Sequence, residues 1–186
     1  MSTYELLLFL HFTAVIIWLG ASSLILLLLF GARSAGDRER EIGEHRQLEW
    51  LAPRLFIPAS LSSFVFGVLL VIDGPWSFDQ LWIVIGLVGW AISFGLGFFY
   101  FKPEGERIAS LADERGMRDA ELEGRLLRVS AVDRVQVLTL FAVVADMVLK
   151  PTGDDTGILV VGGAILVVAA AWAALATRGR ATPAET

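Results

Sequence analysis

The sequence predicts an all-α fold, a single polytopic transmembrane helical bundle of five spans with its N-terminus outside and its C-terminus inside. The first observation is composition: hydrophobic residues make up 55% of the 186 residues and charged residues only 19%. A soluble domain of this length could not bury so much apolar surface, so lipid must be its solvent. The second observation is that the charges lie between five apolar stretches, which predict spans at residues 4–30, 55–72, 81–101, 131–149 and 157–177.

Most of these stretches approach or exceed the ~20 apolar residues that cross a bilayer. The first is not expected to be a cleaved signal peptide, because residues 1–5 contain no basic residue and no Ala-x-Ala site follows. The apolar run of the fourth, residues 135–149, is the shortest and contains Asp146. Its helix is therefore expected to begin near Ala131, with Arg134 and Lys150 extending towards the two interfaces.

Small and aromatic residues predict how the spans pack. Small residues four apart let helix backbones approach closely, and the second and third spans each carry such a series: Ala59, Ser63 and Gly67, then Gly89, Ser93 and Gly97. Aromatic residues near the predicted interfaces are typical of a membrane belt: Trp50, Trp76, Trp82 and Tyr100. Three further tryptophans lie at mid-span, where they fill the bundle or wall a flat cofactor: Trp18, Trp90 and Trp172.

The basic residues predict the orientation, because cytoplasmic loops retain positive charge. Of the 15 Lys and Arg residues, only Lys150 falls on the same side as the N-terminus. That side is therefore expected to be outside. Its acidic residues would attract cations: Glu5, Asp73, Asp79, Asp154 and Asp155.

One sizeable polar segment, the loop at residues 104–130, is predicted on the cytoplasmic side. We expect two short helices separated near Gly116 and lying on the inner membrane surface, with Leu122, Leu126 and Val129 as an apolar stripe. His45, in the preceding cytoplasmic loop, is expected to be an ordinary exposed histidine. It lies on the opposite side from His11, so the two are poor partners for one metal ion.

His11 and Asp146 are the ionisable residues that stand out within the spans. Such groups are costly in hydrocarbon and are functional-site hypotheses by default. At ~1.5 Å per residue, His11 lies roughly 7 Å below the start of its helix and Asp146 about 6 Å inside Lys150. Both are therefore expected in the outer third of the bilayer, where they could share a site.

Three interpretations of His11 remain open. In the first, its ring only fixes helix packing through a hydrogen bond, with Asp146 as one candidate partner. In the second, neutral His11 ligates a haem iron or a copper ion, with Met147 or an open position opposite. In the third, His11 and Asp146 bind or relay a proton or cation in a small transporter. Asp146 has a local alternative, because Lys150 is four residues on along the same helix.

Several classes of site are excluded. The chain has no cysteine, which excludes disulfides, thiolate metal sites, iron–sulfur clusters and covalent c-type haem. It contains no zinc-hydrolase, phosphate-loop, dinucleotide or catalytic-triad motif. No basic face with interleaved aromatic residues predicts a nucleic-acid partner. With two histidines on opposite sides, a bis-histidine cytochrome b within one subunit is disfavoured.

The segment from Leu10-His11 to Trp18-Leu19-Gly20 resembles the first helix of a broad group of small bacterial membrane proteins. This group includes the copper-resistance D-type domain and the membrane-bound, haem-binding protoporphyrinogen oxidase family. Over nearly the whole chain the closer resemblance is to an uncharacterised integral-membrane family, domain of unknown function 2269. It rests on Gly67 with the tryptophans after it, on Phe101-Lys102-Pro103-Glu104, and on Met147-Val148-Leu149-Lys150-Pro151.

The wider resemblance implies that His11 is an axial haem ligand or a copper ligand, in the cytoplasmic (inner) membrane of a bacterium. We therefore expect one b-type haem in the outer half of the bundle, with a redox or haem-handling role. Trp18 would wall the site, Met147 could be a second ligand, and Lys150 could pair with a propionate. The alternatives are a copper ion, an ion-coupled transporter using His11 and Asp146, or a non-catalytic membrane subunit. Whether the chain is an enzyme stays open. The partners expected besides lipid are a second copy of the chain or a redox protein.

Overall fold

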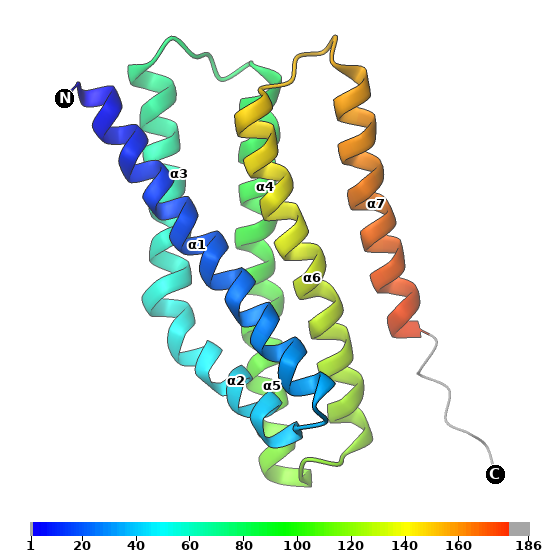
Figure 1. The fold of residues 1–186 in the computed structure, drawn as a ribbon. Helices are drawn as coiled ribbons and strands as arrows, with labels where there is room; N and C mark the ends of the chain where they lie inside the picture. The colour runs from blue at the N-terminus through cyan, green and yellow to red at the C-terminus, as the bar shows by residue number, and fades with distance from the viewer. Residues whose placement is uncertain (1, 179–186) are drawn as a thin grey trace.

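The computed structural model describes residues 2–178, and this part of the chain is helical without any strand. The all-α prediction is therefore confirmed. Seven α-helices follow one another within these residues (Figure 1): α1 Thr3–Ser34, α2 Arg38–Leu51, α3 Ile57–Asp73, α4 Leu81–Leu96, α5 Lys102–Arg115, α6 Ala120–Leu149 and α7 Thr156–Arg178.

Two π-helical turns join neighbouring helices without a break. Ala52–Phe56 connects α2 to α3, and Gly97–Phe101 connects α4 to α5. Prolines lie in or just after these turns, at Pro53, Pro58 and Pro103. Proline has no N–H for the regular helical hydrogen bond, and a π turn relieves the mismatch. The result is two long rods, Arg38–Asp73 and Leu81–Arg115.

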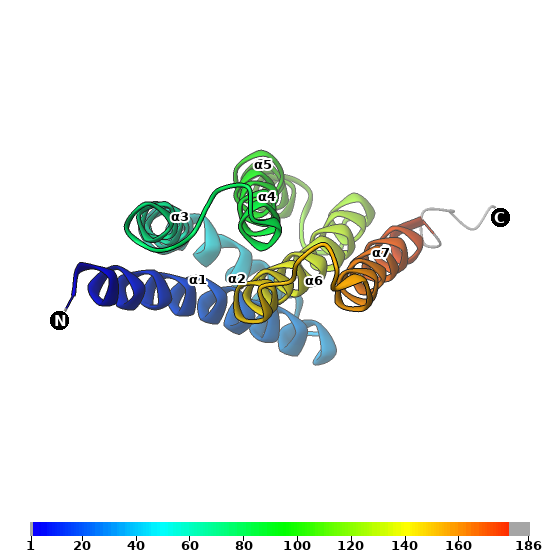
Figure 2. The same cartoon turned by 90° about the horizontal axis from the view of Figure 1, so that it is seen from above.

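Small residues decide which helices pack together. The packing partner of α3 is α1, that of α4 is α6, and α7 lies to one side against α6 (Figure 2). A side chain in place of Gly89 on α4 would overlap Val143 on α6, and one in place of Gly67 on α3 would press on His11 of α1. Gly67 and Gly89 therefore lie in helix contacts, as predicted, and the two series face α1 and α6 instead of each other. Gly97, the last member of the second series, is exposed, and a Cβ added there would meet nothing within 4 Å.

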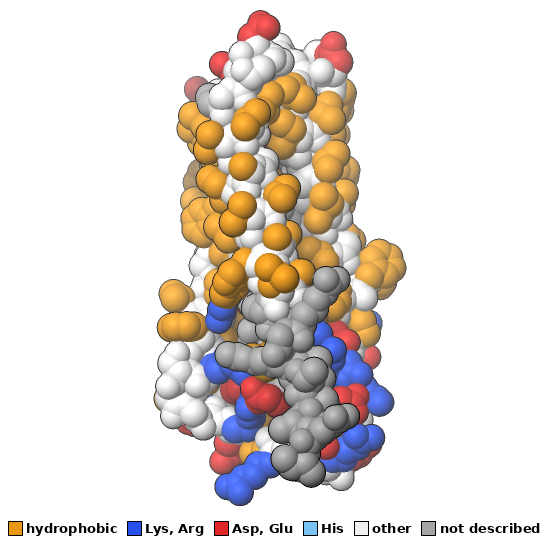
Figure 3. All heavy atoms as spheres, turned by 90° about the vertical axis from the view of Figure 1, so that its right-hand side faces the viewer, with side chains coloured by type: hydrophobic (Ala, Val, Ile, Leu, Met, Phe, Trp, Pro, Cys, Tyr) orange, Lys and Arg blue, Asp and Glu red, His pale blue; other side chains and the backbone are white. Residues whose placement is uncertain are grey.

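The surface is that of a membrane protein. A band of apolar side chains covers the upper part of the molecule, Lys and Arg gather at the lower end, and acidic side chains lie at both ends (Figure 3). In the described residues, three helices are long and apolar enough to cross a membrane: Thr3–Ser34, Arg38–Asp73 and Leu81–Arg115. The described apolar part of α7 is shorter, at Leu159–Leu175, and α6 carries three charged residues in its apolar half: Asp133, Arg134 and Asp146. The count of five spans and the orientation stay predictions. Arg180, which contributes to the orientation argument, lies outside the described residues.

The polar segment extends the bundle along its axis instead of lying flat across its end. The helix break near Gly116 is where it was predicted, but α5 continues α4, and α6 runs unbroken from Ala120 into the apolar half (Figure 1). The stripe on α6 packs against α2 and α5 in a separate core: Ile42, Ile108, Leu111, Ala112, Leu122, Leu126 and Val129. We call α2, α5 and residues 120–130 the charged end. Its apolar stripe is buried by neighbouring helices and needs no membrane surface.

Ion pairs surround this core. Glu41 is 2% exposed and accepts hydrogen bonds from Arg33 at 2.7 Å and Arg38 at 2.8 Å. Both arginines also pair with Glu123 on α6. The expectation for His45 is wrong, because α2 packs against α1 and α5 and leaves this ring only 4% exposed.

Candidate functional site

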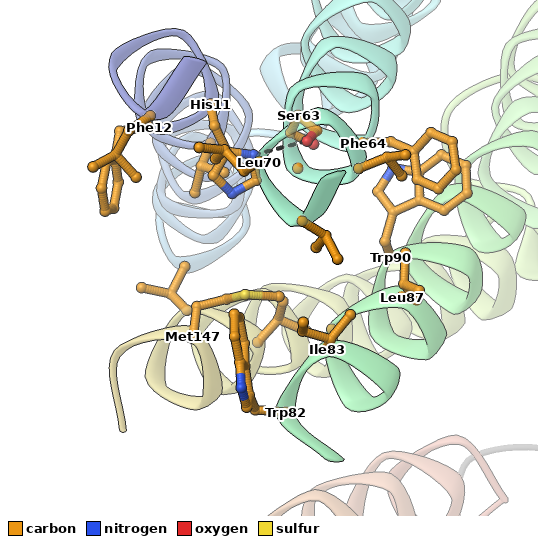
Figure 4. Close-up of a pocket in the computed structure, with 18 of the residues that line it drawn as sticks. His11, Phe12, Ser63, Phe64, Leu70, Trp82, Ile83, Leu87, Trp90 and Met147 are labelled. Atoms are coloured by element: carbon orange, nitrogen blue, oxygen red, sulfur yellow. Dashed lines mark hydrogen bonds between the residues drawn. The ribbon is translucent and has the colours of Figure 1, made fainter. Parts of the chain in front are cut away.

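A pocket of about 440 Å³ lies between α1, α3, α4 and α6 in the apolar half of the bundle. Its walls are mostly aliphatic and aromatic side chains from all four helices (Figure 4). Several of these residues also face outwards, since Phe12 is 50% exposed and Val148 is 68% exposed. The pocket therefore reaches the lipid-facing surface between α1 and α6.

His11 enters this pocket from α1 in a defined tautomer. Its Nδ1 lies 2.8 Å from the backbone carbonyl oxygen of Ser63 on α3. A carbonyl oxygen only accepts, so Nδ1 carries the proton and donates it. In the neutral ring Nε2 then has a free lone pair, and Figure 4 shows the ring on the edge of the open space. Histidines that bind a metal through one ring nitrogen are commonly oriented in this way, by a hydrogen bond from the other nitrogen.

Gly67 makes room for that ring. A Cβ at this position would lie 3.1 Å from His11 Cε1 and 3.3 Å from Nδ1. Both distances are tighter than ordinary van der Waals contact. Gly67 and the Ser63 carbonyl thus fix the ring from one helix. The sequence placed both residues on a packing face and Gly67 in the family resemblance, but it did not link either of them to His11.

Three other residues predicted to form a cofactor site lie around the same pocket. Trp18, Met147 and Lys150 all line the same pocket as His11. Figure 4 shows the Met147 side chain on α6 across the space from His11 on α1. A side chain at Gly86 would overlap the Met147 terminal methyl, so α4 is shaped to accept it.

The mid-span tryptophans differ in their surroundings. Trp90 also lines the pocket; it stacks between Phe64 and Phe94, and its indole N–H donates to the Ser60 carbonyl oxygen at 3.0 Å. Trp172 is 52% exposed on α7. Trp172 packs near Arg134, away from the pocket.

An aromatic cluster holds Lys150 at the end of the pocket nearest the α3–α4 connection. The ammonium lies 3.9 Å from the ring centre of Trp76 and 5.3 Å from that of Trp82. The two indoles pack edge to face, and the Trp76 N–H donates to the Tyr4 hydroxyl at 3.2 Å. Their position near an interface predicted that these tryptophans belong to a membrane belt, and the structure shows that they also surround the Lys150 ammonium.

Asp146 is near the pocket but does not line it. Its side chain is 9% exposed, and both carboxylate oxygens are buried without a hydrogen-bond partner among the described residues. Within residues 2–178 it forms neither the pair with Lys150 nor the hydrogen bond with His11 that its sequence position allowed. A shared His11–Asp146 site therefore stays a prediction.

The pocket offers one histidine and one thioether. The described residues contain no group of three His, Cys, Asp or Glu side chains that could hold a metal ion by themselves. Any metal would need to bring other ligands with it. A porphyrin does so, because it supplies four nitrogens to its iron and leaves the protein only the axial positions.

His45 lies in the charged end, far along the bundle from His11. Burial, followed by the nearby charge of Arg33, lowers its pKa from 6.5 to about 4. Its Nε2 is buried without a hydrogen-bond partner in the described part of the chain. This ring is therefore neutral at physiological pH and belongs to the core of the charged end.

Comparison with known proteins gives a family without an assigned activity. No curated protein and no solved structure was found to match the chain. The wider resemblance to copper-resistance and haem-binding families stays a prediction. A family model described as a predicted integral membrane protein (DUF2269) matches residues 5–151. That range holds His11, Gly67, Asp146 and Lys150, and the chain therefore belongs to this family of integral membrane proteins.

Proposed function

We propose that the protein binds one b-type haem in the pocket, with His11 as an axial ligand, and has a redox or haem-handling role in the membrane. The observation that carries the proposal is the 2.8 Å hydrogen bond from His11 Nδ1 to the Ser63 carbonyl. It leaves Nε2 as a neutral donor to iron and fixes the ring plane.

The pocket fits a flat, apolar group with one charged edge. A volume of about 440 Å³ is within the usual range for cofactor sites, and aromatic walls suit a porphyrin. Lys150 would pair with a propionate at the pocket end, and Met147 would approach the second axial position. When bound, the haem would supply one-electron chemistry. Copper is less well supported, because the pocket offers only a single imidazole and a single thioether.

The test is the visible absorption spectrum of the purified protein in mild detergent, oxidised and then reduced with dithionite. The protein is expressed with ample haem, and three forms are compared: wild type, His11→Ala and His45→Ala. We expect a Soret band that shifts on reduction, is lost in His11→Ala and persists in His45→Ala, which removes the histidine at the other end of the bundle. A colourless wild type would overturn the proposal and leave the ion-site or packing interpretation of His11.

Two further variants separate ligation from packing. Addition of imidazole to His11→Gly should restore the Soret band, because a free imidazole can replace a missing axial ligand but not a missing packing contact. Gly67→Val should lose most of the band while His11 is still present, since the added side chain would push the ring from its position. A Gly67→Val protein with an unchanged spectrum would show that this position of the ring is not needed.

A further inference from the structure

A second hollow lies between α1 and α3, and it shares no lining residue with the His11 pocket. It is a groove of about 280 Å³, which we call the α1–α3 groove. Leu10 and Ile17 of α1 contribute to one wall, and Pro58 and Phe66 of α3 contribute to the other. Ile17 is 42% exposed, so the groove opens towards the surrounding lipid. The proposed haem site does not account for it.

Arg54 is the charged residue among those that line the α1–α3 groove. It lies in the π-helical turn Ala52–Phe56, where the charged end passes into α3. Its guanidinium carbon is 4.5 Å from the ring centre of Trp50, and Nη1 donates to the Trp50 carbonyl oxygen at 2.8 Å. The indole and the carbonyl together hold the cation at one end of the groove.

Arg54 differs from the arginines that stabilise the charged end. Several of those pair with acidic side chains: Arg33, Arg38, Arg40, Arg46, Arg115 and Arg125. Within residues 2–178 Arg54 forms no such pair, and its side chain is exposed. A guanidinium carries several N–H donors in a planar fork that matches the oxygens of a phosphate. Most of the Arg54 donors remain available for such a group.

The length and lining of the groove fit one acyl chain. At ~1.5 Å per residue, Arg54 and Phe66 are about 18 Å apart along the helix axis, and the hydrocarbon of one leaflet is roughly 15 Å deep. Apart from Arg54, the polar residues in the lining are Thr13 and Ser62. The Thr13 hydroxyl already donates to the Phe9 carbonyl oxygen at 2.8 Å. An occupant therefore needs an anionic group at one end and a long apolar chain beyond it.

We propose that the α1–α3 groove binds one anionic phospholipid from the leaflet next to the charged end. Its phosphate lies on Arg54, and one acyl chain lies between α1 and α3. Charge complementarity favours this occupant over a second copy of the chain, because an apolar protein surface would cover the guanidinium without a counter-charge. A net negative headgroup is also attracted more strongly than a zwitterionic one, which carries its own cation.

Native mass spectrometry of the full chain in detergent micelles tests the proposal, with phosphatidylglycerol or phosphatidylcholine added. We expect wild type to retain one phosphatidylglycerol and to bind phosphatidylcholine more weakly. Arg54→Gln should weaken phosphatidylglycerol binding by about fivefold or more, because the charge on the phosphate loses its partner. Lys102→Gln is the matched control and should bind like wild type. Lys102 is exposed and lies 5.6 Å from the ring centre of Phe98, but it lines neither the groove nor the pocket.

A second pair of variants tests the acyl-chain part of the site. Ser62→Phe places a large side chain in the groove and leaves Arg54 in place, so it should lose phosphatidylglycerol. Leu61→Phe changes a neighbouring residue that is 41% exposed and does not line the groove, and it should bind like wild type. Circular dichroism should show the same helix content in all variants. None of the four positions lines the His11 pocket, so any Soret band should also be unchanged, and the lipid result does not depend on haem binding.

Four results would overturn the proposal. Equal phosphatidylglycerol binding by wild type and Arg54→Gln would show that the guanidinium does not hold the headgroup. Equal binding of phosphatidylcholine and phosphatidylglycerol would indicate a groove without selectivity for an anion. Displacement of the lipid by excess inorganic phosphate would indicate an anion site that does not use the acyl chain. A wild-type dimer that is lost in Ser62→Phe would show that a second copy of the chain occupies the groove.

Discussion

At the charged end, acidic side chains bond to arginines around a core of aliphatic residues, whereas in the apolar half several buried polar atoms have no hydrogen-bond partner within residues 2–178. Glu41 is as buried as any acid in the described chain, yet two arginines donate to it. Asp146 is buried to a similar degree without a hydrogen-bond partner in that part of the chain. Burial alone therefore does not distinguish Glu41 from Asp146; what differs is whether the buried carboxylate is hydrogen-bonded.

This difference in hydrogen bonding indicates which region stabilises the fold and which region is available to bind a ligand. A satisfied ion-pair network over a dry core holds helices together, and its members have no remaining capacity to bind a ligand. An unpaired buried imidazole nitrogen or carboxyl group costs stability, and such groups cluster at functional sites. We therefore expect the charged end to respond to mutation mainly through unfolding, and the pocket mainly through ligand binding.

The largest stability effect should come from the core of the charged end. Leu122 is fully buried between α2, α5 and α6, and Leu122→Ala should lower the free energy of unfolding by about 2–5 kcal/mol. The measurement is unfolding in detergent followed by circular dichroism. Leu149→Ala, on the same helix but 57% exposed, is the control and should change the free energy by less than about 0.5 kcal/mol. Equal effects of the two substitutions would contradict the separate core.

A pH-dependent loss of stability should also arise at the charged end. The pKa of His45 is about 4 in the folded protein against about 6.5 when unfolded, so the unfolded state binds the proton more tightly. The resulting stability is fully present above pH 6.5 and falls as the pH drops towards 4. The total loss is about 3 kcal/mol.

The variant His45→Leu isolates this effect from that of the acidic residues. Unfolding of wild type and variant is measured between pH 7 and pH 4, and the difference between them should grow in favour of the variant by about 3 kcal/mol as the pH falls. The pocket spectrum should stay the same in both. Parallel stability curves would mean that His45 can be protonated without unfolding.

The sequence predicts some features of the two regions better than others. His11 stood out because an ionisable side chain within an apolar stretch is conspicuous by itself, and the small-residue series located the helix contacts. The resemblance to an uncharacterised integral-membrane family, which rests on Gly67 with the tryptophans after it and on the segments 101–104 and 147–151, is confirmed by the match over residues 5–151. Hydropathy therefore predicts the all-α fold and the long apolar helices, while the count of five spans and the orientation stay predictions.

The charged end was predicted less well, for a physical reason. Its helices are amphipathic, and an apolar stripe such as Leu122 and Leu126 can be buried by a membrane surface or by other helices with the same sequence pattern. His45 was taken to be exposed because the preference of histidine for the surface is only an average. Lys150 had an acidic residue one turn away, but its ammonium instead lies over two indoles from a distant segment. Contacts between segments that lie far apart in the chain leave no periodic pattern in the sequence from which they could be predicted.

The smallest effect should come from Lys150, where two contributions oppose each other. Lys150 has a φ of 48°, a left-handed conformation that costs a non-glycine residue roughly 1 kcal/mol, while its contact with Trp76 contributes about 0.5–1 kcal/mol. Lys150→Met loses the contact and keeps the strain, so it should be destabilised by about 0.5–1 kcal/mol. Lys150→Gly loses the contact and the strain together and should unfold close to wild type. If the pocket holds a haem whose propionate pairs with Lys150, both variants should bind it more weakly despite this difference in stability. Equal haem affinity in wild type and both variants would assign Lys150 to the aromatic cluster alone.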